Sequence, residues 1–289
     1  MNKLEKRRLK TAARQAHATA SKVVSDKVIA FIGDSFCASF NGNSRYSTVH
    51  ASPVKNSQAC NVQYGHPSLV ADHYGYKLLA HGYMGKSWWY SRTKFLEQIK
   101  QQPEILTKLE AIIFFHTDAN RCNTLNQFVH SINSDPALND WENEEHRQVV
   151  KAQRQWTKHL MDTEFQTWAQ NSWFKEISKE YSHIKQVHFH CFENSTHYNH
   201  LLTGQRFTTP LMQISLGELT GTKEQINQSI IRDTRANHLS EHNNRVLAKT
   251  IIYALDNYLN NLQALDLTKF NLPNPNYVNF PHQRWRTQL

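Results

Sequence analysis

The apolar positions of the chain fall into short continuous runs separated by longer stretches of helical character. Four runs have the length and composition of strands buried on both faces, as in a parallel sheet. They are 28–32 (VIAFI), 77–80 (KLLA), 111–115 (AIIFF) and 186–192 (QVHFHCF). The stretches around them predict helices at 1–24, 66–74 and 241–262. The last of these places five apolar residues on one face: Val246, Leu247, Ile251, Ala254 and Leu255.

Strands that alternate with helices predict an α/β fold, here a three-layer α/β/α sandwich around a mostly parallel central sheet. We expect one main domain over 27–265, with a helical insertion at about 137–182. A basic helical arm over 1–26 precedes it, and an extended tail over 266–289 follows it. In such sheets reactive residues gather beyond the carboxyl ends of the strands, so candidate chemistry is expected directly after each strand.

The composition supports a folded protein, because 39% hydrophobic and 11% aromatic residues can form a sizeable core. No stretch approaches the roughly 20 apolar residues of a membrane-spanning helix, and the N-terminus lacks the apolar segment of a signal peptide. We therefore expect a soluble protein, cytoplasmic by default; non-classical export or association with a virion stays open. The widely spaced Cys37, Cys60, Cys122 and Cys191 favour reduced thiols over a disulfide framework or a zinc ribbon.

The positive charge is concentrated at the N-terminus. The chain carries a formal net charge of +9, and residues 1–27 contain eight basic and two acidic residues. A basic helix of this kind can make weak contacts with a polyanion such as nucleic acid or an anionic surface. A solvated terminal helix is the alternative that we favour.

Two polar motifs stand at the places where this fold puts its chemistry. Gly33-Asp34-Ser35 follows the first strand, and a serine at the start of a helix lies among free N–H groups that favour negative charge. Ser35 could therefore attack a carbonyl and bind part of the oxyanion, although an ordinary helix cap is the alternative. His238 stands just before the last helix and could act as the general base.

Together these motifs resemble the SGNH or GDSL-type hydrolases. VIAFIGDSF matches the family's first block, and RANHLSEHNNRVLA matches the histidine and the helix alanine of the last block, DxxHPNxxGxxxxA. The resemblance covers roughly residues 27–260. It implies the flavodoxin-like SGNH hydrolase fold, with Ser35 as nucleophile and His238 as base.

The second block of the family supplies a glycine N–H to the oxyanion hole from the loop after the second strand. Gly85 is the candidate for that role here, with Gly82 as second choice. Trp88, Trp89 and Tyr90 follow closely, so we expect them at the rim of the site, where aromatic rings suit sugars or acyl chains. A core role for at least one of the tryptophans is an equal alternative.

The third block departs from the family pattern GxND. His116 stands at the glycine position and Asp118 at the asparagine position, and an ionised carboxylate cannot donate a hydrogen bond. Either Asn120 supplies the third donor to the oxyanion, or His116 or Thr117 does.

The catalytic acid is also displaced. Arg235, not aspartate, stands three residues before His238, and Asp233 stands five residues before it. Asp233 could complete a triad; otherwise the enzyme works as a Ser–His dyad, because the other members retain part of the rate enhancement.

Histidine is abundant, at 17 residues, so we considered a metal site. His188 and His190 share one face of a strand, and His197 and His200 follow soon after, a set that could bind zinc. No acidic residue stands at a matching position and there is no HExxH motif. We therefore predict surface or supporting histidines, and neither a metal nor an organic cofactor.

The sequence thus predicts a serine esterase that hydrolyses a carboxylic ester by two-step acyl transfer, with a carbohydrate O-acetyl or short acyl ester favoured as substrate. The candidate substrate-binding residues are Asp34, His116, Asp118, Trp88 and Trp89. The tryptophans of the insertion, Trp141, Trp156, Trp168 and Trp173, are interpreted as packing residues. Two alternatives stay open: a catalytically degenerate SGNH fold that serves as a binding protein, and a polyanion-binding protein acting through the basic arm. The oligomeric state and the identity of the ester stay open as well.

Overall fold

The computed structural model describes residues 25–34, 36–37, 65–82, 87–119, 121, 148, 151–152, 155–156, 158–192, 199–214, 239 and 241–272. Six parallel strands form one sheet in the order β2-β1-β3-β4-β5-β6. The strands are β1 (Val28–Gly33), β2 (Lys77–Gly82), β3 (Leu109–His116), β4 (Lys185–His190), β5 (Gln205–Phe207) and β6 (Leu262–Gln263). The first five follow the flavodoxin-like order of doubly wound folds.

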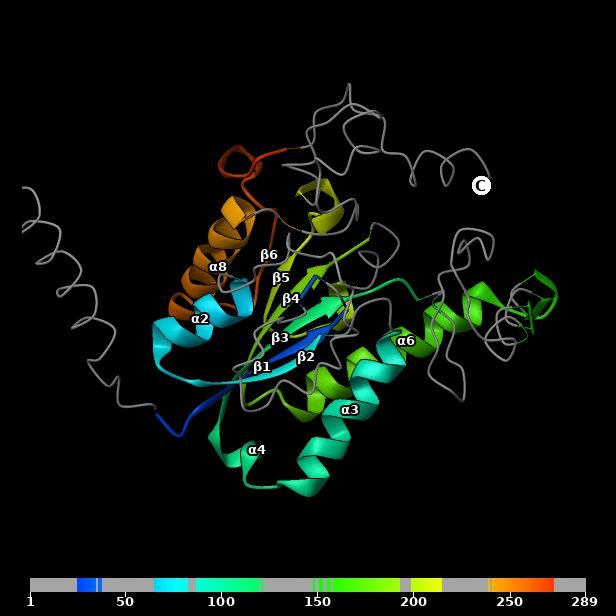
Figure 1. Cartoon of the computed structure of the whole chain (residues 1–289), viewed down its shortest axis with the longest axis horizontal. Coiled ribbons are helices and arrows are strands. Elements are labelled where there is room, and N and C mark those ends of the chain that lie inside the picture. Colours follow the sequence, from blue (N-terminus) through cyan, green and yellow to red (C-terminus); the bar gives the residue numbers. More distant parts are fainter. Residues whose placement is uncertain are drawn as a thin grey trace, which may run out of the picture.

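Helices cover both faces of the sheet (Figure 1). Helices α2 (His66–Tyr74) and α8 (Glu241–Asp256) pack together on one face. Helices α3 (Trp88–Gln101), α4 (Ile105–Lys108) and α6 (Thr163–Glu180) pack on the other. The predicted three-layer α/β/α sandwich is therefore confirmed. Two short 3₁₀ helices, η3 (Leu211–Ile214) and η4 (Leu267–Lys269), follow β5 and β6.

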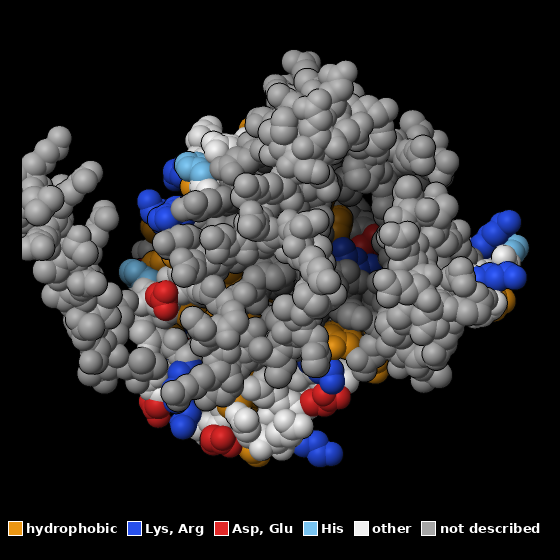
Figure 2. All heavy atoms as spheres, in the orientation of Figure 1, with side chains coloured by type: hydrophobic (Ala, Val, Ile, Leu, Met, Phe, Trp, Pro, Cys, Tyr) orange, Lys and Arg blue, Asp and Glu red, His pale blue; other side chains and the backbone are white. Residues whose placement is uncertain are grey.

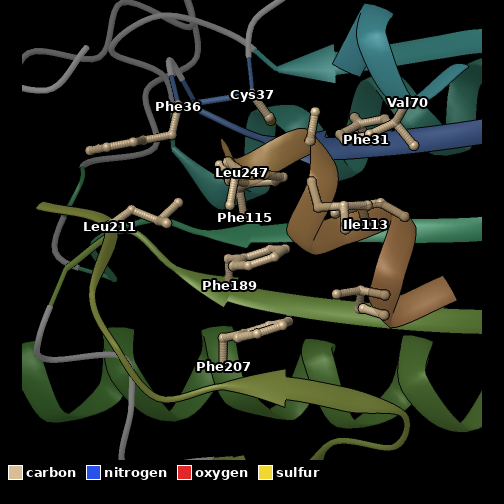
Figure 3. Packing of buried hydrophobic residues seen from close by; sticks show 14 of the residues in the cluster. Phe31, Phe36, Cys37, Val70, Ile113, Phe115, Phe189, Phe207, Leu211 and Leu247 are labelled. Carbon is tan, nitrogen blue, oxygen red and sulfur yellow. The ribbon is translucent and has the colours of Figure 1, made fainter. Parts of the chain in front are cut away.

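A row of phenylalanines joins four neighbouring strands beneath α2 and α8 (Figure 3). Phe31 of β1 stacks on Phe115 of β3 with 6.3 Å between ring centroids, and Phe115 stacks on Phe189 of β4 at 5.3 Å. Phe189 in turn stacks on Phe207 of β5 at 4.6 Å. Full burial of each ring stabilises the fold by roughly 1.5–3 kcal/mol. The row also fixes the register of the strands, because a shift of one residue would turn each ring to the opposite face.

The four strands and the helix at 66–74 are confirmed, with differences at their ends. Strand β4 ends at His190, two residues before the predicted end, and α8 ends at Asp256, not at 262. Strands β5 and β6 were not predicted, because three and two residues are too short to give a periodic signal. Helix α3 was also missed, although Ser87 caps it by accepting a hydrogen bond from the N–H of Tyr90.

Within the predicted helical insertion the structure describes α6, whose N-terminus is capped by Asp162. The packing role predicted for Trp173 is confirmed, since the residue is buried. The same prediction is wrong for Trp168, which is 62% exposed and stacks on Phe165, which is 54% exposed. Residues 1–24 and 273–289, which include the predicted arm and most of the tail, lie outside the described residues, as does Trp141.

Charges of both signs alternate at the end of the molecule that α3 and α4 form (Figure 2). Lys94 pairs with Glu97 at 2.7 Å, and Lys27 pairs with Glu110 at 3.0 Å. Mixed, exposed pairs of this kind are typical of a solvated face, since each contributes less than about 1 kcal/mol. In the part of the chain that the structure describes, no helix has the length and apolar character needed to cross a membrane.

Candidate functional site

The first feature at the carboxyl edge of the sheet is Asp34, which follows β1 and is completely buried. Its Oδ1 accepts a hydrogen bond from the backbone N–H of Phe36 at 3.0 Å, and its Oδ2 accepts one from the hydroxyl of Thr117 at 2.8 Å. The guanidinium of Arg121 lies 3.2 Å from Oδ2. A buried carboxylate is costly unless it is paired and hydrogen-bonded, and these contacts meet both conditions. Asp34 thus ties the turn after β1 to the loop after β3.

Two buried thiols lie against the same aspartate. Cys191, directly after β4, donates to Asp34 Oδ1 at 3.4 Å, and Cys37 donates to the Asp34 carbonyl at 3.5 Å. Burial, followed by the nearby charge of Asp34, raises the pKa of both thiols well above the ordinary value. They are therefore neutral donors. The prediction of free thiols is confirmed for these two cysteines, while Cys60 and Cys122 lie outside the described residues.

Gly33 permits a close approach of β1 to β3 at this point. A Cβ atom at position 33 would lie 2.5 Å from Cβ of Phe115 and 2.6 Å from its carbonyl oxygen, so only glycine fits. The hydroxyl of Ser91 in α3 donates to the Gly33 carbonyl at 2.5 Å. The end of β1 is therefore held from both the neighbouring strand and the covering helix.

Three stacked histidines occupy the opposite face of the same edge. His116 lies with its ring centroid 5.2 Å from that of His188 and 4.8 Å from that of His190. The Thr203 carbonyl, 2.9 Å from Nε2 of His188, can only accept, so this nitrogen carries the proton. Nδ1 of the neutral His188 is then the acceptor for Nε2–H of His116 at 3.0 Å. The proton positions of both rings follow from one carbonyl.

These histidines are neutral. Burial lowers the pKa of His188 to about 3 and that of His190 to about 4. Burial, together with its two neighbours, lowers the pKa of His116 well below the usual range. The predicted shared face of His188 and His190 is confirmed, but a surface position is wrong for both, because that face packs beneath α6.

The same region contains a cavity between the sheet and α6. Its lining residues are His116, Gln170, Asn171, Phe174, His190, Leu201 and Leu202. Gln170 donates to the Thr117 carbonyl at 2.9 Å and so joins α6 to the end of β3. Among the residues that the structure describes, no group of three or more His, Cys, Asp or Glu side chains is arranged to hold a metal ion. Of the other two candidate ligands, His200 is exposed and His197 lies outside the described residues.

The start of α8 is attached to the start of α2 through Asn244. Its Nδ2 donates to the carbonyl of Leu239 at 3.0 Å. Its Oδ1 accepts from the backbone N–H of His66 at 3.2 Å and from His66 Nδ1 at 2.9 Å. Burial lowers the pKa of His66 to about 4, so this imidazole is neutral and donates through Nδ1. Asn244 therefore connects Leu239, the residue that follows His238 in the chain, to the N-termini of both helices.

Half of the predicted site lies within the described residues. Ser35, Gly85, Asn120, Asp233 and His238 lie outside them. The structure brings Asp34 together with the loop that carries His116 and the half-buried Asp118, but His116 faces α6 and its histidine partners.

The two candidate tryptophans have different surroundings. Trp88 is buried and stacks on Trp173 with 5.8 Å between centroids, which is a core position. Trp89 is 46% exposed, and the guanidinium of Arg92 lies 4.7 Å from its ring centroid. Only Trp89 thus offers a ring to the surface.

Sequence reasoning missed Arg121 and the structural role of Thr117. A buried aspartate directly after a buried strand needs a cation, but the sequence offers Lys86 after the second strand as well as Arg121 after the third, and only the sheet order places Arg121 beside Asp34. Asn244 gave no comparable signal, since an asparagine in the first turn of a helix is common.

Comparisons with known proteins leave the family open. No family model matches the chain, and no curated protein matches it. One similar solved structure is a carbohydrate esterase, described as having an active site with divergent catalytic and non-catalytic binding functions. It aligns with a TM-score of 0.37 and 13% identity, over 80% of this chain and 65% of its own. This similarity is too distant to assign a family or an activity.

Proposed function

We propose that this protein is a serine hydrolase of the SGNH type that cleaves a carboxylic ester, with Ser35 as nucleophile and His238 as general base. The observation that carries the proposal is the environment of Asp34, the residue directly before Ser35. The turn after β1 and the loops after β3 and β4 all contribute hydrogen bonds to its buried carboxylate. Such convergence at the carboxyl ends of parallel strands is the expected support for a reactive residue.

The proposed reaction has two acyl-transfer steps. Ser35 Oγ attacks the ester carbonyl while His238 takes its proton, and the backbone N–H groups of Ser35 and Gly85 stabilise the oxyanion. The intermediate collapses, the alcohol leaves, and His238 returns the proton to the alcohol oxygen. Water then gives a proton to His238 and attacks the acyl carbon, and Ser35 leaves with that proton. Asp233 is the candidate residue to orient the imidazole.

Asp34 supports this reaction by position and not by contact with substrate. Its carboxylate is completely buried and its oxygens bind protein groups on three segments. We therefore replace the expectation of substrate binding by a positioning role, in which Asp34 fixes the backbone on both sides of Ser35.

We favour an acylated carbohydrate as the substrate class. Trp89, whose ring is exposed, lies in the first turn of α3, and Ser91 of the same helix binds the end of β1. Because Ser35 follows β1 in the sequence, we expect the Trp89 ring to lie near the same edge of the sheet. An aromatic face with a polar edge suits the apolar face of a sugar ring. Arg92 beside it would add hydrogen-bond donors for hydroxyl or carboxylate groups.

Hydrolysis of p-nitrophenyl acetate and butyrate tests the proposal. We expect the wild type to be active and Ser35→Ala and His238→Ala each to lose at least about 10³-fold in kcat, with unchanged circular dichroism. Trp89→Ala should leave these small substrates unaffected and raise KM for an acetylated oligosaccharide. Equal rates in the wild type and the Ser35→Ala variant would contradict the proposal.

A further inference from the structure

The described polar groups after β3 narrow the choice of side-chain donor to the oxyanion. Asp118, at the position of the usual asparagine, is a carboxylate. The Nε2–H of His116 donates to His188, and the hydroxyl proton of Thr117 is directed to Asp34. The two donors that the sequence suggested here, His116 and Thr117, therefore give these protons to protein groups and not to an oxyanion.

Among the described residues of this loop, Arg121 is a further side chain that contacts Asp34. Its Nη1 lies 3.2 Å from Asp34 Oδ2, and its guanidinium carbon lies 5.2 Å from the ring centroid of Phe192, after β4. The ion pair and the cation–π contact hold the planar group in one orientation. Asp34 has 0% of its side chain exposed and Arg121 has 11%, so Arg121 is the more accessible member of the pair.

We infer that Arg121 acts in place of the family's third-block asparagine and donates an N–H to the acyl oxygen as the oxyanion forms. This inference rests on the proposed function. A guanidinium carries five N–H donors in a fixed fork, so one side chain can bind Asp34 and a second oxygen together. The positive charge adds stabilisation that a neutral amide lacks, and its fixed position means that little reorganisation accompanies the reaction.

A double-substitution experiment separates this role from a structural one. Arg121→Gln leaves the Asp34 carboxylate buried without its cation, so a loss of activity could reflect a damaged turn. Asp34→Asn combined with Arg121→Gln removes both charges and leaves two amides of similar size that can bond to each other. Kinetics on p-nitrophenyl acetate and thermal unfolding are measured for the wild type and for the variants Arg121→Gln, Asp34→Asn, the double variant, Arg121→Lys and Asn120→Ala.

If Arg121 contacts the oxyanion, the double variant regains most of the wild-type Tm but stays about 10²-fold slower in kcat, with KM within about threefold. Arg121→Lys should recover part of kcat, and Asn120→Ala should remain near wild type. Recovery of kcat together with Tm in the double variant would overturn the inference, as would a 10²-fold loss confined to Asn120→Ala. A wild type without esterase activity would instead contradict the proposed function, and this inference with it.

Discussion

At the scale of single residues, the carboxyl edge of the sheet is organised by buried polar groups that bind one another. Arg121 pairs with the Asp34 carboxylate, and two thiols and a threonine donate to the same residue. His188 is held in one tautomer by the Thr203 carbonyl. Each group would be destabilising without its partner, so these residues act as sets.

The buried histidines predict a specific dependence of stability on pH. The pKa values of His66, His81 and His190 are lowered by burial to about 4, and that of His188 to about 3. In the unfolded chain an imidazole has a pKa near 6.5, so between pH 6.5 and 4 the unfolded state binds more protons. The contribution of these neutral histidines to the free energy of unfolding is fully present above about pH 7 and is lost as pH falls toward 4. The loss in the free energy of unfolding is roughly 3 kcal/mol for each histidine with a pKa near 4, and roughly 5 kcal/mol for His188, where it is complete near pH 3.

Urea unfolding at pH 7.5, 6.5, 5.5 and 4.5 measures this dependence. His66→Phe keeps an aromatic ring beside Phe31 and Phe115 and should reduce the slope of unfolding free energy by up to about 1.4 kcal/mol per pH unit. His73→Gln, an exposed position on the same helix, is the matched control and should leave the slope unchanged. Identical slopes in the wild type and the His66→Phe variant would contradict the assignment of a neutral buried imidazole.

At the scale of elements, α2 and α8 share one face of the sheet and meet at their N-termini through Asn244. This side chain binds the backbone on both sides, at His66 and at Leu239. Since Leu239 directly follows His238, the position of α8 should influence the loop that carries the proposed base.

Asn244→Ala tests that connection. The substitution leaves the Leu239 carbonyl and two donors of His66 without their partner, so we expect a loss of about 1–3 kcal/mol in unfolding free energy. We also expect a lower kcat with little change in KM. Asn257→Ala, at the exposed end of α8, is the control and should change both by little. An unchanged kcat in the Asn244→Ala variant would show that the link serves stability alone.

At the scale of the whole molecule, the periodic parts of the fold could be predicted from the sequence. The runs at 28–32 and 111–115 are apolar throughout because β1 and β3 are buried on both faces, and α8 shows a clear apolar stripe. Strands β5 and β6 are too short for such a signal. Helix α3 was missed because Trp88 and its neighbours were interpreted as a rim, whereas Trp88 packs on Trp173, which is distant in the sequence.

The candidate site could also be predicted only in part: the positions of its residues could be, but not their contacts. Strand ends predicted where Asp34 and His116 would lie, but the sequence could not tell which groups they contact. Arg121 pairs with Asp34 across 87 positions of sequence, and His116 pairs with His188 across 72. Such pairs depend on strand order and register, which a single sequence does not specify.

The most direct test of the central claim is covalent labelling of the full chain with a fluorophosphonate, followed by mass spectrometry of the peptides. We predict a single adduct on Ser35, slowed by at least about 10²-fold in the His238→Ala variant and absent in the Ser35→Ala variant. Labelling of a different serine, or a wild type that is not modified while folded, would contradict the assignment of this chain as a serine hydrolase.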